Sequence, residues 1–134
     1  MKEDVRYYAG VDIGSVSTKA ALVSGHRLIA YELAASGGNY RDTAQKVLDS
    51  VLYQAGLNRP RLSGIVVTGL GSESLPFTAR QISDISCQAM GCHCLFPSAR
   101  TVIDIGGQFT KVVRITPQGR IADFLMSEKC ATGS

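Results

Sequence analysis

The sequence lacks long basic runs, long apolar runs and segments of low complexity, and each absence argues against a class of protein. Its 14 basic and 11 acidic residues give a net charge of only +3, with no cluster of Lys or Arg. Binding to nucleic acid is therefore not favoured. No stretch approaches the length of a membrane span, and residues 1–6 contain no apolar core of a secretion signal. We therefore expect a cytoplasmic protein that binds neither nucleic acid nor membranes.

Length and composition are those of a globular protein with a real core. The 134 residues suffice for one ordinary domain, or for one domain and part of another. Hydrophobic residues make up 45% and charged residues 19% of the chain, which is typical of folded domains rather than disordered tails. In a reducing cytoplasm, cysteines are expected as thiols or metal ligands rather than as disulfides. The chain has four: Cys87, Cys92, Cys94 and Cys130.

Two short segments of the chain read alike. They are Asp-Ile-Gly-Ser at residues 12–15 and Asp-Ile-Gly-Gly-Gln at residues 104–108, and each lies between two strand-like runs, the second carrying Lys19 or Lys111. The glycines let bare backbone N–H groups approach a polyanion, and the carboxylate can hold a hydrated Mg²⁺. One such turn is usually only a hairpin. Two in matched context indicate a pair of phosphate-binding turns, and hence nucleotide chemistry without a P-loop.

The remaining pattern predicts alternating strands and helices. Strands are expected at residues 7–13, 17–23, 27–33, 64–69 and 100–105. Asn39 can cap a helix that ends at Gly56, and a second helix, with Ile82 on its apolar face, is expected between Pro76 and Gly91. The resulting order, βββαβαβ, predicts an α/β fold with a mixed sheet.

The pattern restarts after the second aspartate turn. Residues 109–115 and 120–126 repeat strands of the first meander, and the sequence reaches Ser134 before any helix covers them. A bare sheet exposes apolar surface and unpaired edges. We therefore expect a complete first lobe at residues 1–100 and the start of a second, truncated lobe at residues 101–134.

Five motifs, in chain order, carry a resemblance to a known family. They are Gly10-Val11-Asp12-Ile13-Gly14-Ser15, Thr68-Gly69, Ile85-Ser86-Cys87-Gln88-Ala89-Met90-Gly91, residues 101–108 and Lys129-Cys130-Ala131-Thr132-Gly133. With them the chain resembles the N-terminal part of the ATPases that activate 2-hydroxyacyl-CoA dehydratases, and of their relatives in benzoyl-CoA reductase. These proteins belong to the superfamily of actin, sugar kinases and heat-shock chaperones. The resemblance implies a ribonuclease H-like, actin-like ATPase lobe.

The resemblance also implies an electron pump. Members of the family are homodimers that hold one [4Fe-4S] cluster between the subunits, with two cysteines from each. They couple ATP hydrolysis to low-potential electron transfer, from a ferredoxin or flavodoxin type donor to an acyl-CoA dehydratase or reductase component. By matching motif, Cys130 is the first cluster ligand. The second is expected downstream of Ser134, so the chain as it stands is not expected to hold the cluster.

The same resemblance assigns the nucleotide site residue by residue. Asp12 and Asp104 are expected to face each other across a cleft and to hold Mg²⁺ through water, while Gln108 orients the attacking water. These three are the expected catalytic residues. The expected phosphate contacts are Gly14, Ser15, Val16, Ser17 and Lys19 in the first turn, and Gly106 and Gly107 in the second. Because the adenine pocket of the superfamily comes largely from the C-terminal half, residues 1–134 alone are expected to bind ATP weakly or not at all.

Other interpretations stay open at this point. Lys19 and Lys111 also suit solvated strand positions. The cysteines and histidine of residues 87–94 have a composition that suits zinc, but their spacing matches no common zinc finger, and buried or spare thiols are favoured. Two other functions use the same turns: a sugar-type kinase, which needs an acidic general base and no cluster, and an actin-like protein whose nucleotide is structural. A second cysteine beyond Ser134 favours the activator.

Overall fold

The computed structural model describes residues 4–72, 75–106 and 109–127. Contacts between residues divide the chain into two compact units, Met1–Ile82 and Ser83–Ser134. Each unit has its own sheet and its own apolar core. Among the described residues, no helix is long and apolar enough to cross a membrane.

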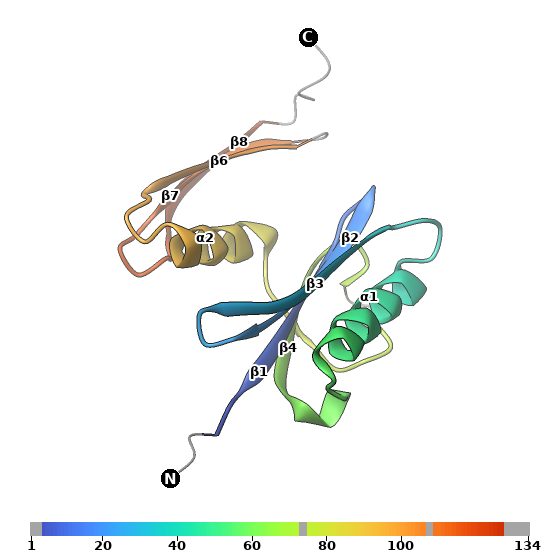
Figure 1. The fold of residues 1–134 in the computed structure, drawn as a ribbon. Coiled ribbons are helices and arrows are strands. Elements are labelled where there is room, and N and C mark those ends of the chain that lie inside the picture. Colours follow the sequence, from blue (N-terminus) through green and yellow to red (C-terminus); the bar gives the residue numbers. More distant parts are fainter. Residues whose placement is uncertain (1–3, 73–74, 107–108, 128–134) are drawn as a thin grey trace. The chain divides into compact units, whose positions relative to one another are not determined.

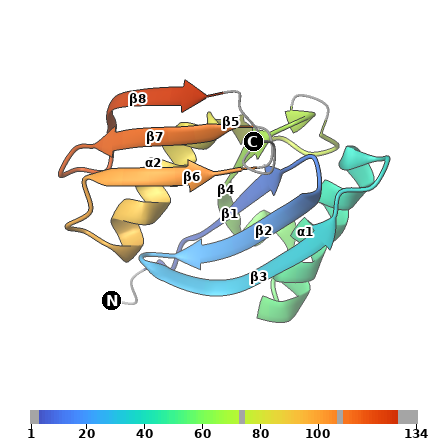
Figure 2. The same ribbon diagram turned by 90° about the horizontal axis from the view of Figure 1, so that it is seen from above.

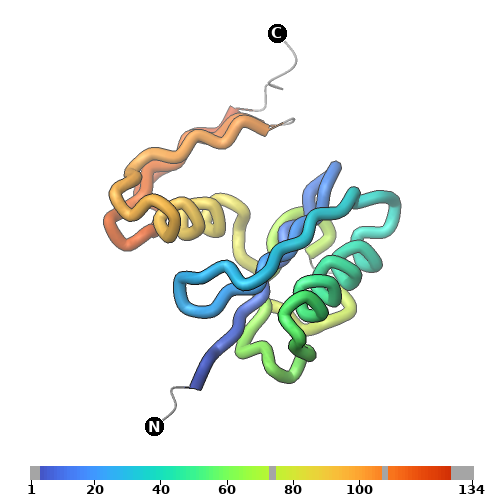
Figure 3. The backbone as a smooth tube through the Cα atoms, in the orientation of Figure 1, coloured from blue at the N-terminus to red at the C-terminus, as the bar shows by residue number. Residues whose placement is uncertain are grey.

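The first unit is built on a five-stranded mixed sheet with the strand order β3-β2-β1-β4-β5. Its strands are β1 (Tyr7–Ile13), β2 (Ser17–Ser24), β3 (Arg27–Ala35), β4 (Leu62–Gly69) and β5 (Arg80–Gln81). The first three form an antiparallel meander with very short links, which Figure 3 shows as a continuous trace. Strand β4 pairs parallel to β1, and β5 pairs parallel to β4. The mixed sheet predicted from the sequence is confirmed.

Helix α1 (Tyr40–Ala55) covers one face of this sheet (Figure 1). The side chain of Asn39 accepts a hydrogen bond from the Asp42 N–H (3.0 Å), and Gly56 ends the helix in the left-handed conformation, as predicted. Its apolar stripe is buried against alternate residues of β1 and β2. The helix contributes Ala44, Val47, Leu48, Val51 and Leu52 to this core, and the two strands contribute Ala9, Val11, Ile13, Ala20 and Leu22. Between α1 and β4 lies a short 3₁₀ helix, η1 (Arg59–Arg61).

The segment after β4 differs from the sequence prediction. Ile82 does not begin a helix, because its N–H donates to the Val67 carbonyl oxygen (3.0 Å) next to the short strand β5, which the sequence pattern did not reveal. Helix α2 (Asp84–Leu95) starts two residues later, with the Ser83 hydroxyl accepting from the Ser86 N–H (3.2 Å). It also passes through Gly91. A glycine inside a helix costs only about 1 kcal/mol, so it does not end one on its own.

The second unit consists of α2 and a three-stranded antiparallel sheet (Figure 2). Its strands are β6 (Thr101–Ile105), β7 (Thr110–Ile115) and β8 (Ile121–Ser127). Ile85 and Ala89 of α2 pack against Val113 and Ile115 of β7, which places the helix on one face of the sheet. Contacts thus group α2 with the second sheet. The lobe boundary between residues 100 and 101 stays a prediction.

Candidate functional site

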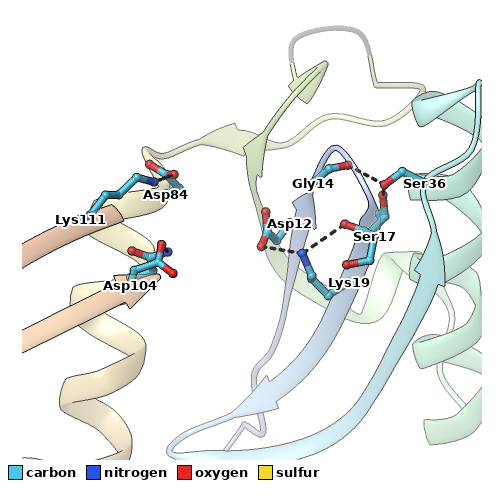
Figure 4. A network of polar contacts seen from close by, with 10 residues as sticks. Asp12, Gly14, Ser17, Lys19, Ser36, Asp84, Asp104 and Lys111 are labelled. Atoms are coloured by element: carbon cyan, nitrogen blue, oxygen red, sulfur yellow. Dashed lines mark hydrogen bonds and ion pairs between the residues drawn. The ribbon is translucent and has the colours of Figure 1, made fainter. Parts of the chain in front are cut away.

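The first aspartate turn joins β1 to β2 and is closed by its own backbone. Asp12 lies opposite Lys19 in the strand register, and the Gly14 N–H donates to the Ser17 carbonyl oxygen (3.0 Å). The Lys19 ammonium donates to the same carbonyl oxygen (3.1 Å) and lies 3.5 Å from the Asp12 carboxylate (Figure 4). Both side chains are more than a third exposed, so the ion pair itself contributes little stability. Its importance is that it places a carboxylate and an ammonium beside one turn.

Glycine is required at position 14 by close approach. A Cβ atom there would lie 2.6 Å from the Ser17 carbonyl oxygen and 3.1 Å from the Lys19 ammonium nitrogen. Because the Gly14 N–H donates within the turn, the backbone donors left for a ligand are those of Ser15 and Val16, whose N–H groups make no hydrogen bond in the described part of the chain. Val16 is also 80% exposed. The tip of the turn therefore offers two adjacent N–H groups to solvent.

A buried hydroxyl network holds this turn from behind. The Ser36 hydroxyl donates to the Gly14 carbonyl oxygen (2.6 Å). The Ser36 backbone N–H donates to the Val16 carbonyl oxygen (2.9 Å). The Thr18 and Ser36 hydroxyl oxygens are 2.8 Å apart, and both residues are fully buried. Since Ser36 uses its only hydroxyl proton on Gly14, Thr18 is the donor between them. The network engages the carbonyl oxygens of Gly14 and Val16, while the N–H groups of Ser15 and Val16 make no hydrogen bond within the described residues.

Gly69, at the end of β4, supports the same turn from the neighbouring strand. It has φ +93°, and a Cβ atom there would lie 2.2 Å from the Ile13 carbonyl oxygen. The next residue, Leu70, donates its N–H to that oxygen (2.8 Å). The Thr68-Gly69 pair seen in the sequence is thus a backbone contact of the first turn, which only glycine permits.

The second aspartate turn repeats the first in backbone detail. Asp104 lies opposite Lys111 in the β6–β7 register, as Asp12 lies opposite Lys19. The Gly106 N–H donates to the Phe109 carbonyl oxygen (2.9 Å), and a Cβ atom at Gly106 would lie 2.9 Å from that oxygen. The structure therefore contains the same aspartate, glycine and lysine arrangement twice, once in each unit.

The two turns differ in what the lysine and the aspartate contact. In the second turn the Lys111 ammonium ion-pairs with Asp84 of α2 instead of the aspartate opposite it. Asp104 accepts a hydrogen bond from the Gln88 side-chain amide (2.7 Å), also on α2. Figure 4 shows the Lys111 side chain reaching Asp84, with Asp104 at the end of the adjacent strand. Sequence reasoning did not assign roles to Asp84 or Gln88, although Gln88 lies in one of the recognised motifs.

Comparison with known proteins identifies the family. Residues 9–134 match the model of the BadF/BadG/BcrA/BcrD ATPase family. The chain belongs to this family. It is 40% identical over 129 residues to the activator of lactoyl-CoA dehydratase from Anaerotignum propionicum, a match that covers 96% of this chain and 49% of that protein.

Two solved structures share the fold of this ATPase-family chain. Component A of (R)-2-hydroxyglutaryl-CoA dehydratase from Acidaminococcus fermentans is 34% identical with a TM-score of 0.84, covering 94% of this chain and 49% of that one. The activator of 2-hydroxyisocaproyl-CoA dehydratase from Clostridium difficile, with bound ADPNP, is 38% identical with a TM-score of 0.81, covering 93% and 47%. The chain spans about half the length of the curated relatives it matches. The predicted actin-like ATPase lobe is confirmed by these structures.

The described residues of this ATPase-family chain fit Mg²⁺. Asp12 and Asp104 lie at the carboxyl ends of β1 and β6, and both are half-buried, so each carboxylate is open to a hydrated ion. Each uses one carboxylate oxygen in a contact, and within the described ranges the other accepts no hydrogen bond. Mg²⁺ prefers oxygen ligands and keeps several of its waters, so one carboxylate per turn is sufficient.

The described cysteines do not fit an iron–sulfur cluster. Cys87, Cys92 and Cys94 all lie on α2. In residues 4–72, 75–106 and 109–127, no group of three or more His, Cys, Asp or Glu side chains is placed to hold a metal ion. Cys130, the residue that the family resemblance assigns to the cluster, lies outside the described residues, as do Gly107 and Gln108.

Proposed function

We propose that the protein is an ATP-hydrolysing activator that drives low-potential electron transfer to a 2-hydroxyacyl-CoA dehydratase, or to an enzyme of the benzoyl-CoA reductase type. The observation that carries the proposal is the duplicated turn, in which an aspartate, a glycine and a lysine recur with the same register and the same backbone hydrogen bond. Activators of acyl-CoA dehydratases are among the relatives, and one such structure contains ADPNP. These names support the proposal for this chain.

In this proposal the first turn binds phosphate oxygens. The N–H groups of Ser15 and Val16, which make no hydrogen bond within the described residues, would donate to them, and the Ser17 hydroxyl would add a further donor. The Lys19 ammonium, more than a third exposed, exchanges its contact with Asp12 for one with a phosphate. Asp12 would then be free to hold Mg²⁺ through a water of its hydration shell. The ion supplies positive charge that offsets the charge of the phosphates.

The second turn makes the corresponding contacts around Asp104. Its carboxylate would hold Mg²⁺ through water, and Gly106 and Gly107, by the family resemblance, would allow close approach of the γ-phosphate. Gln108 orients the attacking water. Catalysis of this kind depends on position and charge and needs no strong base.

The redox part of the proposal depends on family membership. Cys130 is proposed as the first ligand of a [4Fe-4S] cluster shared by a homodimer, with a ferredoxin or flavodoxin type protein as donor and the acyl-CoA enzyme as acceptor. No role is assigned to the three thiols of α2, since their positions do not fit a cluster.

The test uses protein at its natural length, purified without oxygen. We expect the absorption of an iron–sulfur cluster, ATP hydrolysis that requires Mg²⁺, and electron delivery to a 2-hydroxyacyl-CoA dehydratase only while ATP is hydrolysed. The variant Cys130→Ser should lose the cluster absorption and retain ATP binding. A protein that lacks the cluster and transfers phosphate to a sugar hydroxyl would refute the activator and establish the kinase.

A further inference from the structure

We infer that Asp84 and Gln88 of α2 are positioning residues that make Asp104 a stronger Mg²⁺ ligand than Asp12. Asp84 holds the Lys111 ammonium away from Asp104, and Gln88 fixes the carboxylate of Asp104 through a neutral amide. The inference rests on the proposed function, because it concerns the ion of the same nucleotide site. It assigns a role to two helix residues that lie outside both aspartate turns.

The two lysines differ in the carboxylate that each one contacts. The registers place Lys19 opposite Asp12 and Lys111 opposite Asp104, so the default partner of each lysine is the aspartate across the strand pair. Lys19 takes that partner, whereas Lys111 pairs with Asp84. The difference arises from α2, which packs on the face of the second sheet that carries Lys111.

The two lysines also differ in burial. The Lys111 side chain is only 9% exposed, while the Lys19 side chain is 41% exposed. A buried ammonium must be paired, because an unpaired charge in a poorly solvated position is costly. Asp84 satisfies this requirement, so the Lys111 ammonium stays paired with Asp84 when Asp104 binds a cation.

The Asp104 carboxylate is held by a neutral partner. Gln88 donates to one carboxylate oxygen (2.7 Å) and carries no charge, so it orients the group without neutralising it. Asp84 and Gln88 are four residues apart and therefore project from the same side of the helix. Within the described ranges no Lys or Arg ion-pairs with Asp104. A cation at Asp104 has no ammonium to displace, whereas a cation at Asp12 competes with Lys19.

The experiment uses Mn²⁺ without nucleotide, as a paramagnetic substitute for Mg²⁺, on the protein at its natural length. Backbone amide signals around Asp104 should broaden at a lower Mn²⁺ concentration than those around Asp12. Broadening that begins at Asp12, or at both turns together, overturns the inference.

Variants separate a positioning role from a structural one. Asp84→Asn should weaken Mn²⁺ binding at the second turn by about tenfold, because the released ammonium of Lys111 is then attracted to Asp104. The double variant Asp84→Asn/Lys111→Met should recover the affinity, since no ammonium remains to compete. If the affinity stays low in the double variant, Asp84 acts only through the fold and the inference is wrong.

Two further measurements complete the test. Gln88→Ala should lower the Mn²⁺ affinity of the second turn. The control is Asp49→Asn, which removes the exposed carboxylate of α1 that ion-pairs with Arg59, and it should leave that affinity unchanged. Equal effects of these two variants contradict the assigned role. Mn²⁺ preference for Asp104 without any nucleotide binding would refute the proposed function alone, and nucleotide binding without that preference would refute this inference alone.

Discussion

The Ser36→Ala substitution tests how the first turn is held in place. The change removes the hydroxyl that donates to the Gly14 carbonyl oxygen (2.6 Å) and that accepts from Thr18 (2.8 Å). The backbone N–H of Ser36 still donates to Val16, so the chain path is retained. The turn keeps its shape but loses its side-chain anchor.

The expected cost follows from burial. Thr18 and Ser36 are fully buried, so water does not replace the lost partner of the Thr18 hydroxyl. An unsatisfied buried group costs about 1–3 kcal/mol, and we expect Ser36→Ala to lower the free energy of unfolding by about 2 kcal/mol. Ser24→Ala is the matched control, because the Ser24 hydroxyl donates to the Arg6 carbonyl oxygen (2.8 Å) at an exposed site. It should change stability by no more than about 0.5 kcal/mol.

Tyrosine fluorescence during urea unfolding gives a selective readout. Within residues 1–134, all five tyrosines lie in the first unit and there is no tryptophan, so the tyrosine signal of these residues reports on that unit. Thr18→Val should lower the free energy of unfolding by less than Ser36→Ala does. The double variant should lower it by less than the sum of the two single variants, since the two hydroxyls share one hydrogen bond. Equal midpoints for Ser36→Ala and Ser24→Ala would refute the network as a support of the turn.

Three further predictions concern the same unit. Gly69→Ala should destabilise it by more than Gly25→Ala, because both have positive φ but only Gly69 would bring a Cβ atom against a backbone oxygen, 2.2 Å away; equal urea midpoints would count against this. Asn39→Ala should cost about 1 kcal/mol through loss of the α1 cap, again read from the urea midpoint, and no change would mean that the cap is dispensable. Hydrogen bonds from the Ser50 hydroxyl and the Leu33 N–H lower the pKa of Glu32 below its ordinary 4.5. The stability that this carboxylate contributes is therefore fully present above pH 4.5. It is lost as the pH falls through the lower pKa of Glu32 in the folded state. Carboxyl NMR titration should show Ser50→Ala raising the Glu32 pKa, and an unchanged titration would contradict the assigned cause.

Local signals explain which parts of the fold could be predicted from the sequence. Asn39 and Gly56 each act within one helical turn, and the apolar spacing between them is uninterrupted, so α1 could be predicted at both ends. Residues 80–83 could not be predicted in the same way. Their conformation depends on pairing with Val66 and Val67 of β4, which is distant in the sequence, and this pairing postpones the start of α2 to Asp84.

In the candidate site, too, residues with a local sequence signal could be predicted and residues that act through distant contacts could not. The aspartate and glycine of each turn could be predicted, because a turn that lacks room for a Cβ atom leaves a glycine in the sequence. Ser36 and Asp84 could not, because each acts through a long-range side-chain contact, with Gly14 in the first case and Lys111 in the second. An isolated serine or aspartate carries no local sign of such a partner.

The most direct test of the central claim is the binding of a non-hydrolysed ATP analogue in the presence of Mg²⁺, measured by calorimetry on the protein at its natural length. Asp12→Asn and Asp104→Asn should each weaken binding by at least about tenfold, since in the proposed site each removes a carboxylate that would hold the hydrated ion. Asp49→Asn, on the exposed side of α1, should bind like the unaltered protein. Unchanged affinity in both turn variants would contradict the assignment of the two aspartate turns as the nucleotide site.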